Sequence, residues 1–385
     1  METTAIRSLL AAARVTQREQ IAMLKELVQC ESPSESAPDI IRFNDLFAEQ
    51  VAGLAKVKTI PAGRYGRHLQ VEFQLPGPKR KTGQILALGH SDTVWPLGTL
   101  KTMPWREEKG RLWGPGVLDM KGGMAQLIFA ARILRELDIP VEKKLLLQIN
   151  CDEEIGSPAS RELTEKTARA SDAVLVLEPG TGLAGKLKTA RKGIGRYGLR
   201  VEGVAAHSGV DFAAGASAIL ELSRQVETIS GFTNLKRGVT VNVGVVRGGS
   251  RSNIIAPEAT AEIDIRVPRL KDFAALETKF RKLKPADKRC RLFLEGGLNR
   301  PPMERSAGVA RLAKLAIVLA HQLGIKAEES STGGGSDGNF TAALGIPTLD
   351  GLGSVGEGAH APHESILIDR IADRTALLAG LIASV

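Results

Sequence analysis

Cysteine is scarce in this sequence, and long apolar segments are absent. The three cysteines, Cys30, Cys151 and Cys290, lie far apart and form no CxxC pair. Such a sparse, odd set argues against a disulfide framework and against a thiolate zinc site, and it favours a reducing compartment. No segment approaches the roughly 18 consecutive apolar residues of a membrane-spanning helix, and the apolar patch LLAAA near the N-terminus is too short for a signal peptide. We therefore expect a cytoplasmic protein that does not enter a membrane.

Aromatic residues are also few, at 4% of the chain, and this limits what its basic charge can mean. The formal net charge is +9, a balance found in proteins that bind nucleic acid, acidic membranes or acidic substrates. The positive residues are scattered, and few aromatic side chains are available to stack on bases. We interpret the densest basic segment, residues 279–291, as a solvated helix face and expect no nucleic-acid partner.

The first half of the chain has the pattern of an α/β domain. Apolar runs of strand length at 84–90, 144–151 and 172–178 alternate with helical patterns at 17–29 and 122–138. This alternation predicts a mixed, mostly parallel sheet flanked by helices. Because the apolar runs are nearly continuous, we expect both faces of the strands to be covered. The strands would end at one edge of the sheet, where such sheets bind ligands.

The pattern changes near residue 188. Residues 238–249 and 259–268 alternate between apolar and polar side chains, and a helical pattern at 215–230 precedes them. Alternation with period two is typical of antiparallel strands that are covered on one face. We predict an inserted α+β domain whose antiparallel sheet carries helices on one side.

The inserted domain is predicted to cover residues 188–299. Residues 1–187 and 300–385 would then form the first domain together, and a chain of 385 residues is long enough for both. Residues 295–303, EGGLNRPPM, are rich in glycine and proline, and we expect them to be the linker that returns to the first domain.

Side chains that bind metals stand at the predicted strand ends and in loops. Taken singly, each has an ordinary explanation: Asp119 could cap the following helix, and Glu178 could be solvated. Together they are harder to attribute to chance, because independent strand ends would have to collect His, Asp and Glu at one edge of the sheet. Imidazole and carboxylate ligands suit zinc, and two ions about 3.5–4 Å apart often share a carboxylate. A metal pair would also remove the repulsion between the three consecutive acids, Asp152, Glu153 and Glu154. The candidates are His90, Asp92, Asp119, Glu153, Glu154, Glu178, His360 and His363.

These motifs resemble, in order along nearly the whole chain, the co-catalytic zinc exopeptidases and deacylases. The segments that carry the resemblance are GHSDTVW, GPGVLDMKGGMA, DEEIGS, LEPG, AAHSG, GGSRSNIIAPEATAEIDIR, TGGGSDG and GEGAHAPHE. This family includes acetylornithine deacetylase, succinyl-diaminopimelate desuccinylase and aminoacylases, and the likeness is greatest to its glutamate carboxypeptidase (carboxypeptidase G type) branch. The resemblance implies a catalytic di-zinc domain with an inserted lid through which two copies form a homodimer.

The resemblance also implies a role for each candidate ligand. Asp92 would orient His90 from outside the metal shell. Glu153 would be the general base that moves a proton from water to the leaving amine. A cis peptide bond is implied after Asp119, and His363 is expected to be a bystander. Two zinc ions, replaceable by cobalt or manganese, would be held by His90 and Glu178, by Glu154 and His360, and by Asp119 between them.

Residues of the lid and of two loops are implied to bind the substrate. His207 in AAHSG would reach across the dimer and polarise the scissile carbonyl, although it could also be an ordinary surface histidine. Asn253 and Arg266 would hold the substrate's carbonyl and carboxylate, although Arg266 could instead pair with a neighbouring acid on its strand. Lys186 would bind a carboxylate, and Gly334 would let the backbone approach a ligand closely.

The expected activity is hydrolysis of an amide bond next to a free carboxylate, in a small peptide or an N-acyl amino acid. The branch tends to carry an arginine before Thr-Gly-Gly-Gly, where this chain has Ser331, so a bidentate carboxylate clamp is missing. A deacetylase or desuccinylase of amino-acid biosynthesis and a dipeptidase remain alternatives. A metal- or peptide-binding protein without activity is a further alternative, although a binder would not need Glu153.

Overall fold

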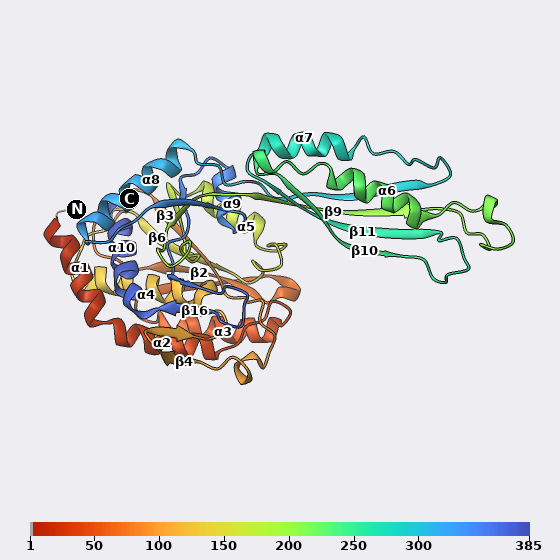
Figure 1. Ribbon diagram of the computed structural model, residues 1–385. Coiled ribbons are helices and arrows are strands. Elements are labelled where there is room, and N and C mark those ends of the chain that lie inside the picture. Colours follow the sequence, from red (N-terminus) through yellow and green to blue (C-terminus); the bar gives the residue numbers. More distant parts are fainter. Residues whose placement is uncertain (1–2) are drawn as a thin grey trace. The chain divides into compact units, whose positions relative to one another are not determined.

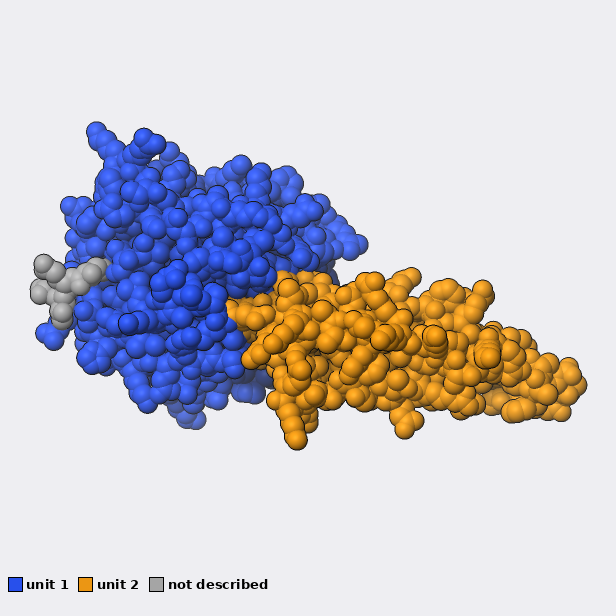
Figure 2. Space-filling view, turned by 90° about the horizontal axis from the view of Figure 1, so that it is seen from above, with its two compact units in different colours: residues 1–190, 305–332, 336–385 blue, residues 191–304, 333–335 orange. Residues whose placement is uncertain are grey.

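The computed structural model describes residues 3–385, and the chain divides into two compact units (Figure 2). Unit 1 comprises residues 1–190, 305–332 and 336–385, and unit 2 comprises residues 191–304 and 333–335. The three glycines Gly333–Gly335 therefore cluster with unit 2, although the sequence pattern groups them with the first domain. No helix within residues 3–385 is long and apolar enough to cross a membrane.

Unit 1 is built around a six-stranded sheet (Figure 1). Its three central strands run parallel to one another, and they are the three apolar runs recognised in the sequence, so this prediction is confirmed. Two antiparallel strands extend one side of the sheet, and a short parallel strand extends the other. The strand order is β1 (Ala55–Pro61), β2 (Arg67–Phe73), β6 (Lys144–Asn150), β3 (Gln84–His90), β7 (Ala173–Val176) and β14 (Thr348–Leu349).

Helices cover both faces of this sheet, which explains why the central strands read as continuous apolar runs. Within β3, Ile85 and Ala87 join the large core under α1, α2, α4 and α10, whereas Leu86 and Leu88 join a smaller core beside α5 and α9. Helix α4 is buried on almost all sides and contacts α1, α2 and α10. The helices of unit 1 are α1 (Thr3–Val15), α2 (Gln17–Gln29), α3 (Ala37–Gln50), α4 (Gly122–Glu136), α5 (Arg161–Arg169), α8 (Ala307–Gln322), α9 (Gly338–Ala343) and α10 (Ile371–Ser384).

Two small sheets complete unit 1. One pairs the segment that precedes the turn before α4 with the C-terminal part of the chain, because β5 (Arg111–Trp113) lies beside β16 (Ser365–Leu367). Its outer strands are β4 (Arg106–Glu108) and β15 (Gly356–Glu357). The other sheet pairs β8 (Leu187–Arg191) with β13 (Glu329–Thr332). Both pairings bring together segments that lie far apart in the sequence.

Unit 2 is an antiparallel sheet with its two helices on one face, as the sequence predicts (Figure 1). Alternate residues of β11 point into a core shared with α6 and α7, and the residues between them are half-buried or exposed. This is the one-sided burial that period-two alternation indicates. The strand order is β10 (Thr240–Gly248), β11 (Glu258–Val267), β9 (Gly193–Glu202) and β12 (Arg291–Arg300), and the helices are α6 (Ala218–Ser230) and α7 (Leu270–Phe280).

Two expectations about unit 2 are wrong. Residues 295–300 are not a linker, because they form the second half of β12 and pair with β9. Gly296 is needed there, because a Cβ atom at this position would lie 2.1 Å from the carbonyl oxygen of Arg196. The basic segment 279–291 is not a helix face either, because α7 ends at Phe280 and the following residues form a turn before β12.

Candidate metal centre

The five predicted metal ligands come together at the edge of the unit 1 sheet. His90 is the last residue of β3, Glu154 follows β6, and Glu178 follows β7, so three neighbouring parallel strands each deliver one ligand. Asp119 lies in the turn Val117–Lys121 before α4, and His360 lies in the loop between β15 and β16. This meeting of strand ends is the arrangement in which parallel sheets bind ligands.

Close packing between α4 and β7 brings the turn that carries Asp119 next to the end of β7. A Cβ atom on Gly123 would lie 2.1 Å from the carbonyl oxygen of Leu177, which precedes Glu178. Only glycine allows the start of the helix to approach the strand end this closely. The peptide bond between Asp119 and Met120 is cis, as the family resemblance implies.

Asp119 faces both histidines with its two carboxylate oxygens. Oδ1 lies 3.3 Å from Nε2 of His90, and Oδ2 lies 3.3 Å from Nε2 of His360. Glu178 Oε1 lies 3.8 Å from the His90 nitrogen, and Glu154 Oε2 lies 3.2 Å from the His360 nitrogen. The result is two groups of three ligands, each with its ligand atoms within 4.8 Å of one another, and Asp119 belongs to both. A shared carboxylate is the arrangement expected between two neighbouring ions.

The charges of the centre fit a bound cation. Burial raises the pKa of Glu154 to about 7, since its negative charge is costly away from water. Hydrogen bonds to Asp119 and Glu154 raise the pKa of His360 to about 11, so a proton on the imidazole partly neutralises the acids around it. A divalent cation would neutralise them further and would leave the imidazole available as a ligand. Two imidazoles and three carboxylates are donors that zinc and similar ions accept.

Asp92 holds both His90 and the loop of acids in place. Nδ1 of His90 donates a hydrogen bond to the main-chain carbonyl of Asp92 at 2.8 Å, which leaves Nε2 as the nitrogen that faces the centre. The Asp92 carboxylate lies farther from Nδ1, at 3.6 Å, and accepts hydrogen bonds from the backbone N–H groups of Glu153 and Glu154, each at 3.1 Å. Asp92 is fully buried, and burial raises its pKa.

The three consecutive acids serve three different purposes. Asp152 is buried and turns away from the centre, where its Oδ2 accepts hydrogen bonds from the N–H groups of Ala159 and Ser160 just before α5. Glu154 contributes to the ligand group of His360. Glu153 belongs to neither ligand group, but it directly precedes Glu154, and its backbone N–H donates to Asp92, whose carbonyl accepts from His90. A carboxylate close to a metal-ligand group and not part of it is free to accept a proton.

A buried carboxylate that the sequence analysis missed supports the same loop. Asp337 accepts hydrogen bonds from Nδ2 of Asn150 and from Oγ of Ser157, both at 2.5 Å, and so it connects the two ends of the segment that carries the acids. Asp337 lies in TGGGSDG, where the glycines drew attention to the backbone and away from the acid. Its position just before α9 is that of an ordinary capping residue, so local sequence alone does not indicate this role.

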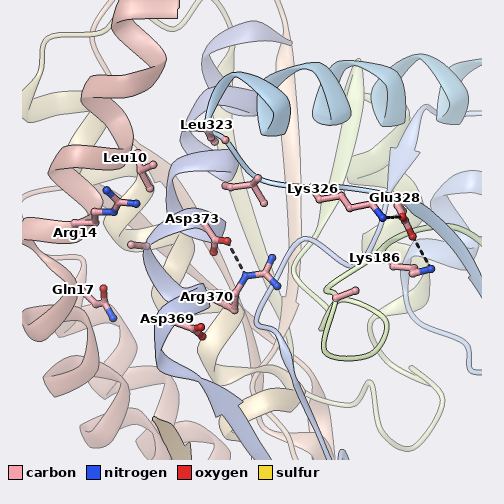
Figure 3. A pocket seen from close by; sticks show the side chains of 14 residues that line it. Leu10, Arg14, Gln17, Lys186, Leu323, Lys326, Glu328, Asp369, Arg370 and Asp373 are labelled. Atoms are coloured by element: carbon pink, nitrogen blue, oxygen red, sulfur yellow. Dashed lines mark hydrogen bonds and ion pairs between the residues drawn. The ribbon is translucent and has the colours of Figure 1, made fainter.

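Lys186 does not lie among the metal ligands. Its ammonium pairs with Glu328 at 2.7 Å and lines a cavity of about 640 Å³ beside α1 and α10, together with Arg14, Lys326 and Arg370 (Figure 3). Among the described residues, the cavity lining contains none of the five predicted ligands. Lys188, which the sequence analysis missed, is the lysine nearer to the centre, with Nζ 4.0 Å from Oε2 of Glu178.

The remaining predicted substrate residues lie in unit 2. His207 is exposed, and its Nδ1 accepts a hydrogen bond from the N–H of Gly209 at 3.1 Å. Asn253 is also exposed, and its carbonyl accepts a hydrogen bond from the N–H of Ser208, so the loops of His207 and Asn253 lie side by side.

Arg266 and Gly334 are connected within unit 2 through the glycine-rich segment. Arg266 pairs with Asp264 through two hydrogen bonds, at 2.8 and 3.0 Å, as its alternative interpretation expects. Its Nη1 also contacts the carbonyl of Gly333, at 3.4 Å. The carbonyl of Gly334 accepts a hydrogen bond from the buried Arg191 at 3.2 Å.

Comparison with known proteins gives consistent matches. The model of peptidase family M20/M25/M40 matches residues 86–384. Carboxypeptidase G2 from Pseudomonas sp. (strain RS-16) is 29% identical over 384 residues, covering 97% of this chain and 91% of that protein. Among solved structures, aminopeptidase PepT from Bacillus cereus matches with a TM-score of 0.81 at 23% identity, covering 95% of this chain and 98% of that one. The M20 family metallo-carboxypeptidase Sso-CP2 from Sulfolobus solfataricus matches with a TM-score of 0.73 at 19% identity, with the same coverage.

Proposed function

The chain belongs to peptidase family M20/M25/M40 and is a metallopeptidase that hydrolyses amide bonds, and we propose that it acts on small peptides or N-acyl amino acids with a free carboxylate next to the scissile bond. The observation that carries this proposal is the pair of ligand groups that share Asp119, with Glu153 outside both groups but next to Glu154 and bonded through its backbone to Asp92. The similarity to carboxypeptidase G2 along almost the whole chain supports the choice of a carboxylate-bearing substrate.

We propose that the centre holds two zinc ions, for which cobalt or manganese could substitute. His90 and Glu178 would hold one ion, Glu154 and His360 the other, and Asp119 both. Bound there, the ions would lower the pKa of water and polarise the scissile carbonyl. Asp119 would keep both histidines oriented before an ion binds, because its carboxylate faces each of them. The hydrogen bond from Nδ1 of His90 to the carbonyl of Asp92 would also fix the ring of His90.

Glu153 is the proposed general base. It would accept a proton from the attacking water and deliver it to the leaving amine. Its backbone N–H is bound to Asp92, and its loop is bound to Asp337, so the carboxylate would stay in place during the transfer. Both supporting acids are buried, which favours a rigid loop.

Unit 2 would supply the groups that bind the substrate. In a homodimer formed through this unit, the partner subunit's His207 would stabilise the negative charge that develops on the carbonyl oxygen. Asn253 and Arg266 would bind the substrate's carbonyl and carboxylate. Ser331 stands where the glutamate carboxypeptidase branch has an arginine. We therefore propose that the substrate residue with the free carboxylate need not be a glutamate.

The carboxylate requirement can be tested with matched substrates. The panel contains N-acetyl, N-succinyl and N-aroyl amino acids and dipeptides, and each is compared with its C-terminal amide. We expect kcat/KM to fall by roughly 10–100-fold for the amides, because a charge-assisted hydrogen bond is lost. A chelated sample restored with zinc serves as the control for metal dependence.

Each result of the panel has a distinct meaning. Equal cleavage of acids and amides would refute the carboxylate requirement. A preference for N-acetyl or N-succinyl substrates would support a biosynthetic deacylase, and a preference for dipeptides would support a dipeptidase. Metal-loaded protein that cleaves nothing would support a binding protein instead.

The role of His207 across a dimer can be tested by mixing two inactive variants. In a dimer of H207A with E153Q, one active site has its own Glu153 and an intact histidine from the partner. Random exchange between the variants should therefore restore about one quarter of wild-type activity. Activity is measured before and after the variants are mixed and allowed to exchange subunits. A mixture that stays inactive although heterodimers form would contradict action across the dimer.

A further inference from the structure

Glu364 is a buried carboxylate that accepts four hydrogen bonds from neutral donors. Its side chain is 0% exposed. Oε2 accepts from Nε1 of Trp95 at 2.8 Å and from the N–H of Gly116 at 3.0 Å. Oε1 accepts from the N–H of Leu118 at 2.8 Å and from the N–H of Asp119 at 3.1 Å. A buried carboxylate is costly unless its oxygens are satisfied in this way.

The donors come from the segments that carry the metal ligands. Gly116, Leu118 and Asp119 belong to the turn that presents the shared carboxylate, and Trp95 lies in the loop after His90 and Asp92. Glu364 itself follows His360 by four positions and immediately precedes β16. Because Ser365 pairs with Trp113 of β5, the backbone at Glu364 is held by a sheet. The carboxylate therefore connects three ligand-bearing segments from a fixed position.

We propose that Glu364 is a positioning residue that orients Asp119 and thereby sets the affinity for both metal ions. Asp119 must present Oδ1 to His90 and Oδ2 to His360, each at 3.3 Å, so a small rotation of its backbone would withdraw one oxygen from its ion. Glu364 restricts this rotation because it binds the N–H of Asp119 itself and the N–H of the preceding residue. The inference rests on the proposed two-ion centre, and Glu364 is not a ligand in it.

The test is the metal affinity of the Glu364→Gln variant. Whichever way the amide turns, its NH₂ group faces two N–H donors, so two of the four hydrogen bonds are lost. Substitutions of this kind behind metal ligands typically weaken metal binding by about 10–100-fold. We expect this loss for both ions, because Asp119 belongs to both ligand groups. Affinities for zinc are measured by competition with a chromophoric chelator, which needs no substrate.

Glu221 provides a matched control in unit 2. It is buried and likewise accepts hydrogen bonds from two backbone N–H groups, those of Ala286 and Asp287, each at 3.0 Å. Glu221→Gln makes the same chemical change away from the predicted ligands, and we expect it to leave both zinc affinities unchanged. A general loss of stability would affect both variants, whereas the positioning role predicts weaker zinc binding in Glu364→Gln alone.

The outcomes separate this inference from the proposed function. Two zinc ions bound by Glu364→Gln as tightly as by the wild type would overturn the inference and leave the proposed function standing. A wild-type protein that binds no zinc would overturn both. Should Glu364→Gln not fold, Glu364→Asp replaces it, because aspartate keeps the charge but is too short to reach all four donors. For Glu364→Asp we likewise expect weaker binding of both zinc ions. Binding as tight as in the wild type would overturn the inference.

Discussion

Replacing Glu153 by glutamine is expected to lower turnover by about 10²–10⁴-fold while both metal ions stay bound. Glutamine has nearly the same size as glutamate but cannot accept the proton of the attacking water. The ions should remain, because Glu153 belongs to neither ligand group. The loop should keep its shape as well, because the contact to Asp92 uses the backbone N–H of Glu153 and not its side chain.

The adjacent residue supplies the comparison for this prediction. Glu154→Gln is the same substitution one position along the chain, but Glu154 contributes to the ligand group of His360. We expect Glu154→Gln to lose metal as well as activity, whereas Glu153→Gln loses activity alone. The two measurements are elemental analysis of the purified variants and turnover of the best substrate in the panel. Substantial turnover by the Glu153→Gln variant would contradict the role of Glu153 as general base. Loss of metal from this variant would indicate that Glu153 is a metal ligand.

The central sheet could be predicted because its strands have an unusually clear pattern. Residues 85–88 and 145–147 are apolar at consecutive positions, as is typical of strands between two layers of helices. Parallel strands must be joined by crossover connections, which are usually helices. The helical pattern at 122–138 lies between two of these strands and fits such a connection. The antiparallel sheet of unit 2 was recognisable for the opposite reason, since one-sided burial produces alternation in β11.

Pairings between distant segments could not be predicted. Strands β5 and β16 have three residues each and pair across more than half the sequence, so neither contains enough residues to show a period. The glycines and prolines of residues 295–303 favour a linker, whereas residues 295–300 form the second half of β12. There, glycine serves the close approach of two backbones, a requirement that depends on the partner strand and not on the local sequence.

The five residues that meet at the centre can be picked out of the sequence, and so can Asp92 beside His90, but the more distant residues that support them cannot. His90 ends one recognisable strand, Glu154 and Glu178 follow the ends of two others within four residues, and their side-chain types limit their chemistry. Glu364 acts through Gly116 and Leu118, which are about 250 residues away, and its sequence neighbours give no sign of this contact. Lys186 and Lys188 show the same limit, because the path of the loop after Glu178 decides which lysine approaches the centre.

Asp119→Asn is expected to remove the shared ligand and with it most of the activity. Asparagine is nearly isosteric with aspartate, but it has one oxygen and an NH₂ group that cannot bind a cation. Only one of the two histidines could then face an oxygen at residue 119. We expect bound metal to fall from two ions per chain to at most one. Because the ions should supply several kcal/mol of transition-state stabilisation, turnover should fall by roughly 10³-fold or more.

A buried aspartate of unit 2 shows whether the loss of metal is specific to the shared position. Asp272 is 4% exposed and pairs with Arg237, so Asp272→Asn also neutralises a buried aspartate, but in the other unit. It should keep both ions and its activity even if its melting temperature drops. Asp119→Asn should lose metal at temperatures where its circular dichroism spectrum still matches the wild type, because the contacts of the surrounding turn to Glu364 use backbone N–H groups that the substitution leaves intact. Two tightly bound ions and normal turnover in Asp119→Asn would mean that the two ligand groups work independently, and the shared carboxylate would then have no part in the mechanism.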